Sequence, residues 1–344
     1  MNFEGFKRSD GRVGTRNITA VLPTIGCANE IAYQISKAVA QSTTMLHNHA
    51  CIRLGEDSVR ARKTLIGIGE NPNIGAVLVV GLGCEPIKAD EIEAEIQKTG
   101  KPVKRVSLEE LGNYDAVVRE GVASLRVLVE QTEQMRREPC DVSNLTIGIK
   151  CGGSGAISAV SSNPAVGKAA DLIIQNGGKV IFTETAELIG AEHVLAKRGA
   201  TPAIEKALLD VVTDMKREIA RCGVDLLGSE PTQGNIKNGL TTIEEKSLGA
   251  IIKGGTMPLV GVLRYAQRPE RPGLYFMDGT TQASQLFLGM FAAGAQIQLF
   301  SVGGGLPARI RGLPSYPPGF PALPVLKVLG SCDDEAEKPY FDVY

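Results

Sequence analysis

The junction between residues 145 and 165 combines residue types that could hold an anion. The apolar run Leu145–Ile149 ends at Lys150 and continues into Cys-Gly-Gly-Ser-Gly. A strand that stops at glycines leaves backbone N–H groups free at its carboxyl end, where open α/β sheets bind their ligands. A lysine at the end of an apolar strand is costly to bury without an anionic partner. We therefore expect an anion site formed by Lys150, Gly152, Gly153 and Ser154, to which the thiol of Cys151 could contribute.

Two glutamates follow the next expected strand, residues 179–183. Glu184 and Glu187 would lie near the same edge of a parallel sheet as Lys150, where either one could act as the acid or the base of a proton transfer. Acidic residues are also favoured in the first turn of a helix, because the helix dipole stabilises them there. A role at a helix start is therefore the alternative.

Three cysteines of the first half each follow an expected strand. They are Cys27, Cys51 and Cys84, and His49 lies two residues before Cys51. The carboxyl ends of parallel strands share one edge of the sheet, so this spacing predicts a metal site. Thiolate and imidazole ligands favour iron or zinc over magnesium. The alternative is that these cysteines are small buried apolar residues, as free cysteines often are.

Two arginines flank a glycine-containing entry to the first strand. Arg12 and Arg16 are expected to bind substrate carboxylates, because the planar guanidinium group suits bidentate contacts. The alternative is a solvated N-terminal arm.

Strands and helices alternate along the chain and must position these residues. The first half predicts strands at 17–25, 43–47, 76–80 and 103–106, and helices at 30–41, 57–69, 90–98 and 114–137. The second half predicts strands at 145–149, 179–183, 274–277 and 296–302, and helices at 165–176, 187–197, 201–221 and 282–292, with another from 241. Residues 228–239 and 303–324 are expected as loops. This order is typical of parallel sheets flanked by helices.

The chain length exceeds what one hydrophobic core usually supports. We therefore predict an α/β protein of two lobes, residues 1–139 and 140–344, each with a Rossmann-like or flavodoxin-like parallel sheet. Of the 344 residues, 37 are basic and 38 acidic, which gives a net charge of -1 and no field that would attract nucleic acid or a membrane. Seven widely spaced cysteines argue against a disulfide framework. No signal sequence or membrane span is evident, so a cytoplasmic protein is expected.

Five motifs together resemble the galactarate dehydratase and altronate dehydratase family. The resemblance covers nearly the whole chain, and its blocks occur in the family's order. The motifs are Gly11–Asn17, Val80–Glu85, Lys150–Ser154, Asn163–Ala165 and Gly239–Gly249.

The resemblance implies a hydro-lyase that acts on a sugar acid or a related 2-hydroxy acid. Such an enzyme abstracts an α-proton and eliminates the β-hydroxyl, which gives a 2-keto-3-deoxy acid. The resemblance also implies iron, as Fe²⁺ or as an iron–sulfur cluster, and makes Lys246 a base or an enediolate-stabilising cation. In the loop before Lys246 and at the start of its helix, the expected substrate contacts are Gln233, Asn235, Thr241 and Thr242.

The sequence departs from the dehydratase pattern at two places. Gly155 stands where the family usually has aspartate, and Val302–Gly305 replaces a stretch that usually contains arginine. These departures argue against galactarate and altronate as substrates. A sulfo-lyase large subunit that releases sulfite from sulfolactate, and a non-catalytic sugar-acid binder, are the alternatives.

The chain begins where the family's large catalytic part begins, so a separate small subunit is an expected partner, together with self-association into a homo-oligomer. A nicotinamide dehydrogenase is a further alternative. Its signal is weak, because the glycines after Lys150 lack the G-x-G-x-x-G spacing and the next acid, Glu184, follows some 30 residues later.

Overall fold

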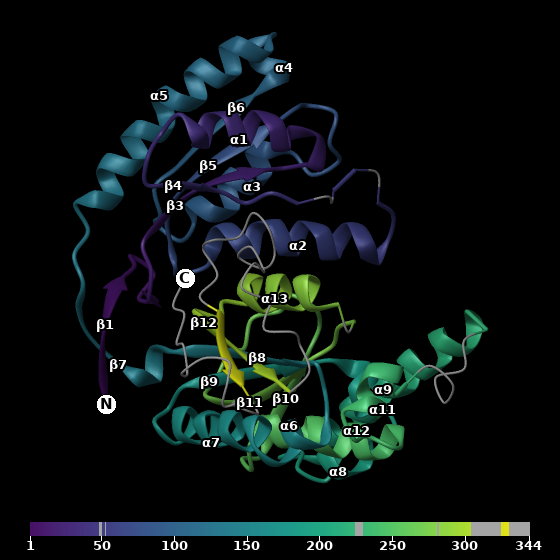
Figure 1. Ribbon diagram of the computed structural model, residues 1–344. Coiled ribbons are helices and arrows are strands. Elements are labelled where there is room, and N and C mark those ends of the chain that lie inside the picture. Colours follow the sequence, from purple (N-terminus) through teal and green to yellow (C-terminus); the bar gives the residue numbers. More distant parts are fainter. Residues whose placement is uncertain (48–49, 52, 224–229, 281, 304–324, 330–344) are drawn as a thin grey trace. The chain divides into compact units, whose positions relative to one another are not determined.

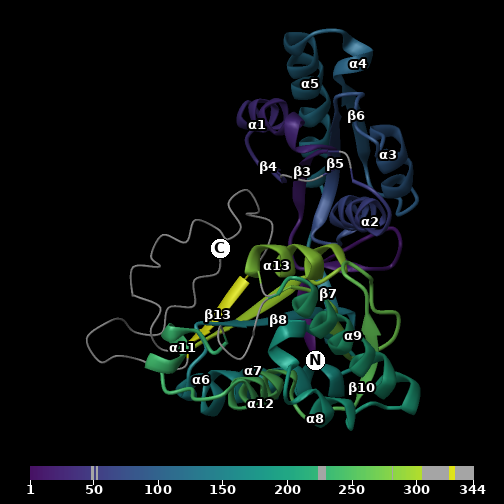
Figure 2. The same ribbon diagram turned by 90° about the vertical axis from the view of Figure 1, so that its right-hand side faces the viewer.

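The chain folds into two compact units, described here from a computed structural model (Figures 1 and 2). The structure describes all residues except 48–49, 52, 224–229, 281, 304–324 and 330–344. In the described part of the chain, the first unit contains Met1–Asp141 and Phe291–Gln296, and the second contains Val142–Met290, residues 297–303 and Val325–Leu329. Helices flank parallel sheets in both units, which confirms the predicted α/β class.

The first unit is built on a four-stranded parallel sheet. Its strand order is β4-β3-β5-β6, and the strands are Ser42–Thr44, Ile18–Pro23, Ile74–Gly81 and Val103–Ser107. Helices α1 (Asn29–Lys37) and α5 (Tyr114–Glu133) lie on one side, and α2 (Glu56–Glu70) and α3 (Ala89–Gln97) on the other (Figure 2). The short elements η1 (Gly26–Ala28) and α4 (Leu108–Leu111) complete the connections.

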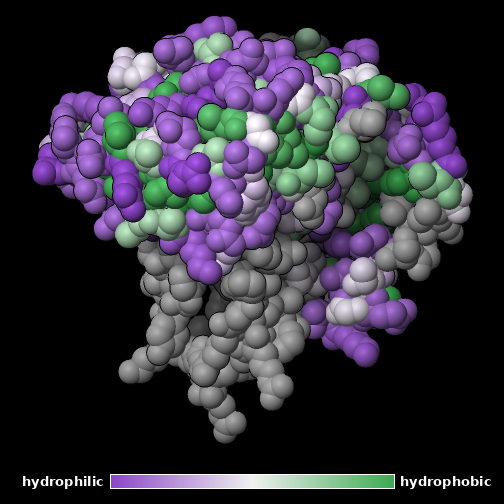
Figure 3. Space-filling model, turned by 90° about the horizontal axis from the view of Figure 1, so that it is seen from above, coloured by the Kyte–Doolittle hydropathy of each residue, from purple (hydrophilic) through white to green (hydrophobic). Residues whose placement is uncertain are grey.

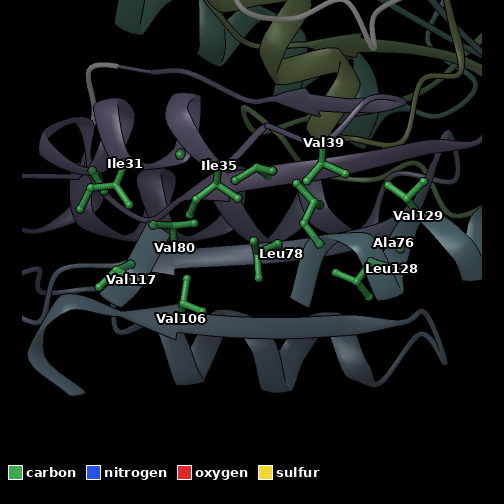
Figure 4. Close-up of a cluster of buried hydrophobic side chains, with 14 of the residues drawn as sticks. Ile31, Ile35, Val39, Ala76, Leu78, Val80, Val106, Val117, Leu128 and Val129 are labelled. Atoms are coloured by element: carbon green, nitrogen blue, oxygen red, sulfur yellow. The ribbon is translucent and has the colours of Figure 1, made fainter. Parts of the chain in front are cut away.

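The core of this unit lies between the sheet and the pair α1 and α5. Ile31 and Ile35 from α1 meet Leu78 and Val80 from β5 and Leu128 from α5 (Figure 4). Every residue of β5 is buried, as expected for a central parallel strand covered on both faces.

A small antiparallel sheet, which the sequence pattern did not predict, joins the two ends of this unit. It has the order β2-β1-β7, with β1 at Asn2–Lys7, β2 at Val13–Gly14 and β7 at Glu138–Asp141. The strands are short, and β1 pairs with residues more than 130 positions away. Periodicity within a short window cannot detect such a pairing.

The second unit is built on a six-stranded parallel sheet. The strand order is β10-β11-β9-β8-β12-β13, and the strands are Leu259–Leu263, Gly273–Met277, Lys179–Thr183, Thr146–Gly152, Ile297–Val302 and Val325–Leu329. Helix α13 (Ala283–Ala292) lies on one side of the sheet, and α7 (Ser162–Gln175) on the other (Figures 1 and 2). The remaining elements are η2 (Val142–Asn144), α6 (Ala156–Val160), η3 (Thr185–Leu188), α8 (Glu192–Ala196), α9 (Pro202–Arg221), α11 (Gln233–Lys237), α12 (Ile243–Ile251) and η4 (Ile252–Gly254).

The observed elements of the second unit differ from the sequence-based predictions in three respects. The helix expected at 187–197 is two pieces, η3 and α8, because Gly190 adopts a φ of 89° between them. The loop expected at 228–239 contains α11 in its described part. Strands β10 and β13 were not expected. The loop expected at 303–324 lies, after Gly303, outside the described residues.

The described helices include none that is both long and apolar enough to cross a membrane. Figure 3 shows one face of the molecule, on which hydrophilic residues predominate and hydrophobic residues form smaller groups. Such a mixture is ordinary for protein surfaces, since apolar atoms always contribute to the exposed area.

Candidate active site

The site begins where two neighbouring parallel strands of the second unit end. Lys150 and Cys151 lie near the end of β8, and Glu184 directly follows β9. Strand β8 is also the point where the sheet order reverses, since the chain continues from β8 to β9 on one side and from β12 to β13 on the other. Open α/β sheets bind their ligands beside the carboxyl ends of the strands at such a point.

Glu184 is a fully buried carboxylate held by two lysines. Its Oε1 accepts a hydrogen bond from Lys150 Nζ at 2.6 Å, and its Oε2 accepts one from Lys253 Nζ at 2.6 Å. The backbone N–H of Cys151 also donates to Oε2, at 2.9 Å. The φ of Glu184 is 91°, a conformation that non-glycine residues rarely adopt and that clusters at functional sites.

Lys253 brings a second ammonium group into the interior from η4. Its side chain is 2% exposed, and its Nζ lies 3.0 Å from Cys151 Sγ and 3.5 Å from Glu187 Oε2. Gly167 in α7 permits this approach, because a Cβ there would lie 2.4 Å from the carbonyl oxygen of Ile252.

Glu187 connects this interior to Lys246 and, through Lys246, to the partly exposed Glu230. Its Oε2 accepts a hydrogen bond from Cys151 Sγ at 3.0 Å, while its Oε1 lies 3.7 Å from Lys246 Nζ. Lys246 also pairs with Glu230 at 2.5 Å. The Glu230 side chain is 30% exposed, against 1% for Glu184, so the cluster opens toward Lys246 and Glu230.

The charges of the cluster shift the pKa values of its members. Burial alone would raise the pKa of Glu184, but Lys150 and Lys253 outweigh it and lower the pKa to about 2. Burial would lower the pKa of each of the three lysines, but the neighbouring negative groups raise them, most strongly for Lys253. The pKa of Cys151 lies well above its ordinary value, because burial and the two glutamates outweigh the lysines. The resting state therefore contains ammonium groups, an ionised Glu184 and a neutral thiol.

The structure brings together all four residues that the sequence suggested for catalysis, Lys150, Glu184, Glu187 and Lys246. Sequence reasoning did not assign Lys253 or Glu230 to the site. Lys253 carried a usable signal, since it follows Ala-Ile-Ile within an apolar run, the same feature that singled out Lys150. Cys151 was expected only as a thiol of the anion-binding junction and was not assigned a catalytic role.

The substrate contacts predicted in the second unit lie on the turn after β8, on α11 and just before α12, the helix that carries Lys246. Asn235 Nδ2 donates to the carbonyl of Ser154 at 2.9 Å, which ties α11 to the turn after β8. Thr242 caps α12 by accepting from the Glu245 N–H, and Thr241 donates to the Glu245 carboxylate. Gln233 is exposed. The turn residues Gly152, Gly153 and Ser154 are partly buried. Substrate contacts by these residues stay predictions.

Gly155, where the family usually has aspartate, lies against α11. A Cβ at Gly155 would lie 2.8 Å from the Asn238 Cβ and 3.0 Å from its carbonyl oxygen. An aspartate therefore does not fit here unless Asn238 moves.

The predicted arginines belong to the first unit. Arg12 Nε donates to Asp10 Oδ2 at 2.7 Å, and the carbonyl of Arg16 accepts a hydrogen bond from Arg8 Nη2 at 2.9 Å. Their expected contact with substrate carboxylates stays a prediction.

The cysteines predicted as metal ligands follow three adjacent strands of the first unit, β3, β4 and β5. Cys27, Cys51 and Cys84 are exposed, and His49 lies outside the described residues. The three thiols do not form a ligand group within 4.8 Å, a criterion that Cys151, Glu184 and Glu187 alone meet in the described part of the chain. Lys253 already contacts all three members of that second group, so those residues as arranged do not fit a resident metal.

The chain is an α/β protein with parallel sheets. The buried lysine–glutamate cluster at the carboxyl ends of β8 and β9 is an enzyme-like site. The family model for the D-galactarate/altronate dehydratase C-terminal part matches residues 142–334, and the model for the second domain of D-galactarate dehydratase/altronate hydrolase matches residues 5–133. The chain belongs to the D-galactarate/altronate dehydratase family, and the cluster lies in its C-terminal part.

Three curated relatives cover most of the chain. The (2R)-sulfolactate sulfo-lyase subunit beta of Chromohalobacter salexigens is 36% identical over 95% of the chain and 81% of its own length. The altronate dehydratase of Escherichia coli is 34% identical over 88% of the chain, and that of Bacillus subtilis is 32% identical over 89%. The chain spans 62% and 63% of the lengths of these two dehydratases. The relatives are lyases, which supports the hydro-lyase interpretation and an enzyme-like role.

Proposed function

We propose that the chain is a hydro-lyase that acts on a sugar acid or related 2-hydroxy acid by α-proton abstraction and β-elimination. The observation that supports this reaction best is the buried cluster of three ammonium groups around Glu184 and Glu187. Removing a proton next to a carboxylate produces an enediolate with two negative charges, and fixed cations in a water-poor site stabilise such charge strongly.

Glu187 is the proton acceptor in this proposal. Its Oε1 faces the accessible side of the cluster near Lys246, where a substrate can approach. Glu184 is unsuited to the role, because a carboxyl with a pKa of about 2 binds a proton weakly at neutral pH. Glu184 instead holds Lys150 and Lys253 in place.

Lys246 is the proton donor to the departing β-hydroxyl. The C3–O bond breaks as the ammonium of Lys246 gives its proton to the oxygen, and water leaves. The product enol then becomes a 2-keto-3-deoxy acid. Glu187 is left protonated and Lys246 neutral, and the 3.7 Å between them allows a proton transfer that restores both.

The test combines a substrate screen with one substitution. The purified chain is supplied with a panel of sugar acids, and 2-keto acid formation is measured. Lys246→Met is expected to abolish turnover while circular dichroism shows an intact fold. Wild-type rates from Lys246→Met would remove this residue from the mechanism. Binding of a sugar acid without product would favour the non-catalytic binder instead.

Sulfite elimination is the second candidate, because the sulfo-lyase subunit beta matches the chain over a larger share of its own length than the dehydratases do. The proton abstraction would be the same, but a C3–S bond would break and sulfite would leave without needing a strong acid. Assaying sulfolactate for sulfite release in the same screen separates the two leaving groups.

Iron is the cofactor that we propose, held by Cys27, His49, Cys51 and Cys84. Family membership suggests a metal, and the described thiols are exposed after adjacent strands. As they stand, the three thiols do not all lie within 4.8 Å of one another, so metal binding would have to draw them together. Thiolate and imidazole donors suit iron, which supplies a Lewis acid when bound. Anaerobically purified protein should contain iron, and Cys84→Ser should contain less. Cys140→Ser, which changes a buried cysteine, is the control and should keep the wild-type iron content. Full iron content in Cys84→Ser would contradict this ligand set.

A separate small subunit is the proposed partner, since one relative, which the chain matches over 81% of its length, is itself a subunit. Purification with and without a candidate small subunit, followed by the same assays, tests whether turnover requires it. Light scattering on the chain alone tests the proposed homo-oligomer.

A further inference from the structure

Three potential metal ligands converge inside the cluster. Cys151 Sγ and one carboxylate oxygen each of Glu184 and Glu187 all lie within 4.8 Å of one another. A thiol and two carboxylates are a donor set that zinc, cobalt or iron could bind. The residue types alone would therefore suggest a second metal site.

Lys253 already provides a cation at this point. Its Nζ lies 2.6 Å from Glu184 Oε2, 3.0 Å from Cys151 Sγ and 3.5 Å from Glu187 Oε2. These are the atoms that a metal would need. A metal ion and an ammonium group cannot share this point, because like charges repel strongly in a buried site.

The charges of the cluster balance without a metal. The ammonium groups of Lys150, Lys246 and Lys253 are matched by the carboxylates of Glu184, Glu187 and Glu230. Cys151 then remains a neutral thiol that donates to Glu187. A metal would require the thiolate, and so would change both the charge and the hydrogen bonding of the cluster.

We infer that Lys253 is the built-in cation of this cluster and takes the place of a metal ion at Cys151, Glu184 and Glu187. In the proposed reaction Lys253 is a positioning residue. It contacts Glu187 Oε2 and leaves Glu187 Oε1 directed toward Lys246. The role in the reaction rests on the proposed function, but the identity of the cation does not.

Cobalt binding tests the inference without any substrate. Co²⁺ bound by a thiolate gives a near-ultraviolet charge-transfer band, and subtracting the spectrum of the Cys151→Ser protein isolates the part due to Cys151. The exposed thiols of the first unit cancel in this difference. The wild-type protein is expected to show no Cys151-dependent band. A stoichiometric band in wild type would overturn the inference, because it would make the cluster a metal site.

Lys253→Met supplies the complementary result. Removing the ammonium group leaves three ligand atoms and an excess negative charge, so a Cys151-dependent cobalt band is expected to appear. Lys150→Met is the matched control, since it removes a buried ammonium that contacts Glu184 Oε1 and leaves Lys253 in place. A band that appears equally in both variants would contradict a specific role for Lys253.

The wild-type measurement remains decisive if Lys253→Met does not fold. Lys253→Arg, which retains a cation, then serves as the second variant and should show no band. A Cys151-dependent band in Lys253→Met supports the inference when the wild-type protein lacks the band. The same band in both proteins would contradict it. A protein without any lyase activity could still give the expected spectra, so the two proposals fail separately.

Discussion

Glu184 accepts hydrogen bonds from two ammonium groups and one backbone N–H, so its carboxylate is fixed in both charge and position. The other carboxylate, Glu187, contacts Lys253 only at 3.5 Å and shares its Oε2 with the Cys151 thiol. At the scale of single residues, the cluster therefore separates a structural carboxylate from one that can exchange a proton.

Glu184→Gln should ionise Cys151. The substitution removes one negative charge from a balanced, buried cluster, and loss of the thiol proton restores the balance. We expect increased thiolate absorbance near 240 nm at neutral pH, absent from Glu184→Gln/Cys151→Ser. An unchanged spectrum in the folded single variant would show that Cys151 does not respond to the charge of Glu184.

Glu187→Gln should lower kcat about 10²- to 10⁴-fold, the usual contribution of a positioned general base. The amide keeps the size of the side chain but cannot accept the α-proton. Glu244→Gln, an exposed change in the first turn of α12, is the control and should leave kcat unchanged. Similar rates in the two variants would exclude Glu187 as the base.

At the scale of elements, the close packing of α7 on η4 places Lys253. Gly167 in α7 lets the backbone of Ile252 approach, and Asp171 one turn later accepts hydrogen bonds from the N–H groups of Thr256 and Met257. The position of a buried ammonium group thus depends on a glycine and an aspartate of a neighbouring helix.

Gly167→Ala should destabilise the second unit by about 1–3 kcal/mol, because the added Cβ would lie 2.4 Å from the Ile252 carbonyl oxygen. Turnover should fall as well, since η4 carries Lys253. Gly234→Ala in α11 is the matched control, because its Cβ would meet only Thr232 Oγ1 at 3.7 Å. Denaturant unfolding of both variants measures the difference. Equal stabilities would mean that η4 can shift without cost.

The alternation of strands and helices predicted β8, β9 and the convergence of Lys150 with Glu184, because a parallel sheet brings successive strand ends to one edge. The same logic could not place Lys253. It arrives from η4, a three-residue turn that follows a helix, and only tertiary packing against Gly167 brings it to the strand ends. The pairing of β1 with β7 was likewise inaccessible, since it joins distant and very short segments.

At the scale of the whole molecule, two parallel sheets are built from one chain, and the entire lysine–glutamate cluster belongs to the second unit. The overall charge is only -1, so an anionic substrate is attracted by local groups rather than by the field of the protein. The buried ion pairs also couple the stability of this unit to pH.

The stability of the second unit should fall as pH drops from about 4.5 toward 2. The folded-state pKa of Glu184 is about 2, below the ordinary value of 4.5, so its ionisation stabilises the fold above about pH 4.5 and this contribution is lost as the carboxylate is protonated. A shift of this size corresponds to on the order of 3 kcal/mol. Circular dichroism during denaturant unfolding at several pH values measures the loss.

Glu184→Gln should be less stable than the wild type at neutral pH, because it leaves two lysines partly uncompensated, but its stability should depend less on pH between about 4.5 and 2. Parallel pH profiles for the two proteins would mean that Glu184 is not the carboxylate that couples this unit to acid.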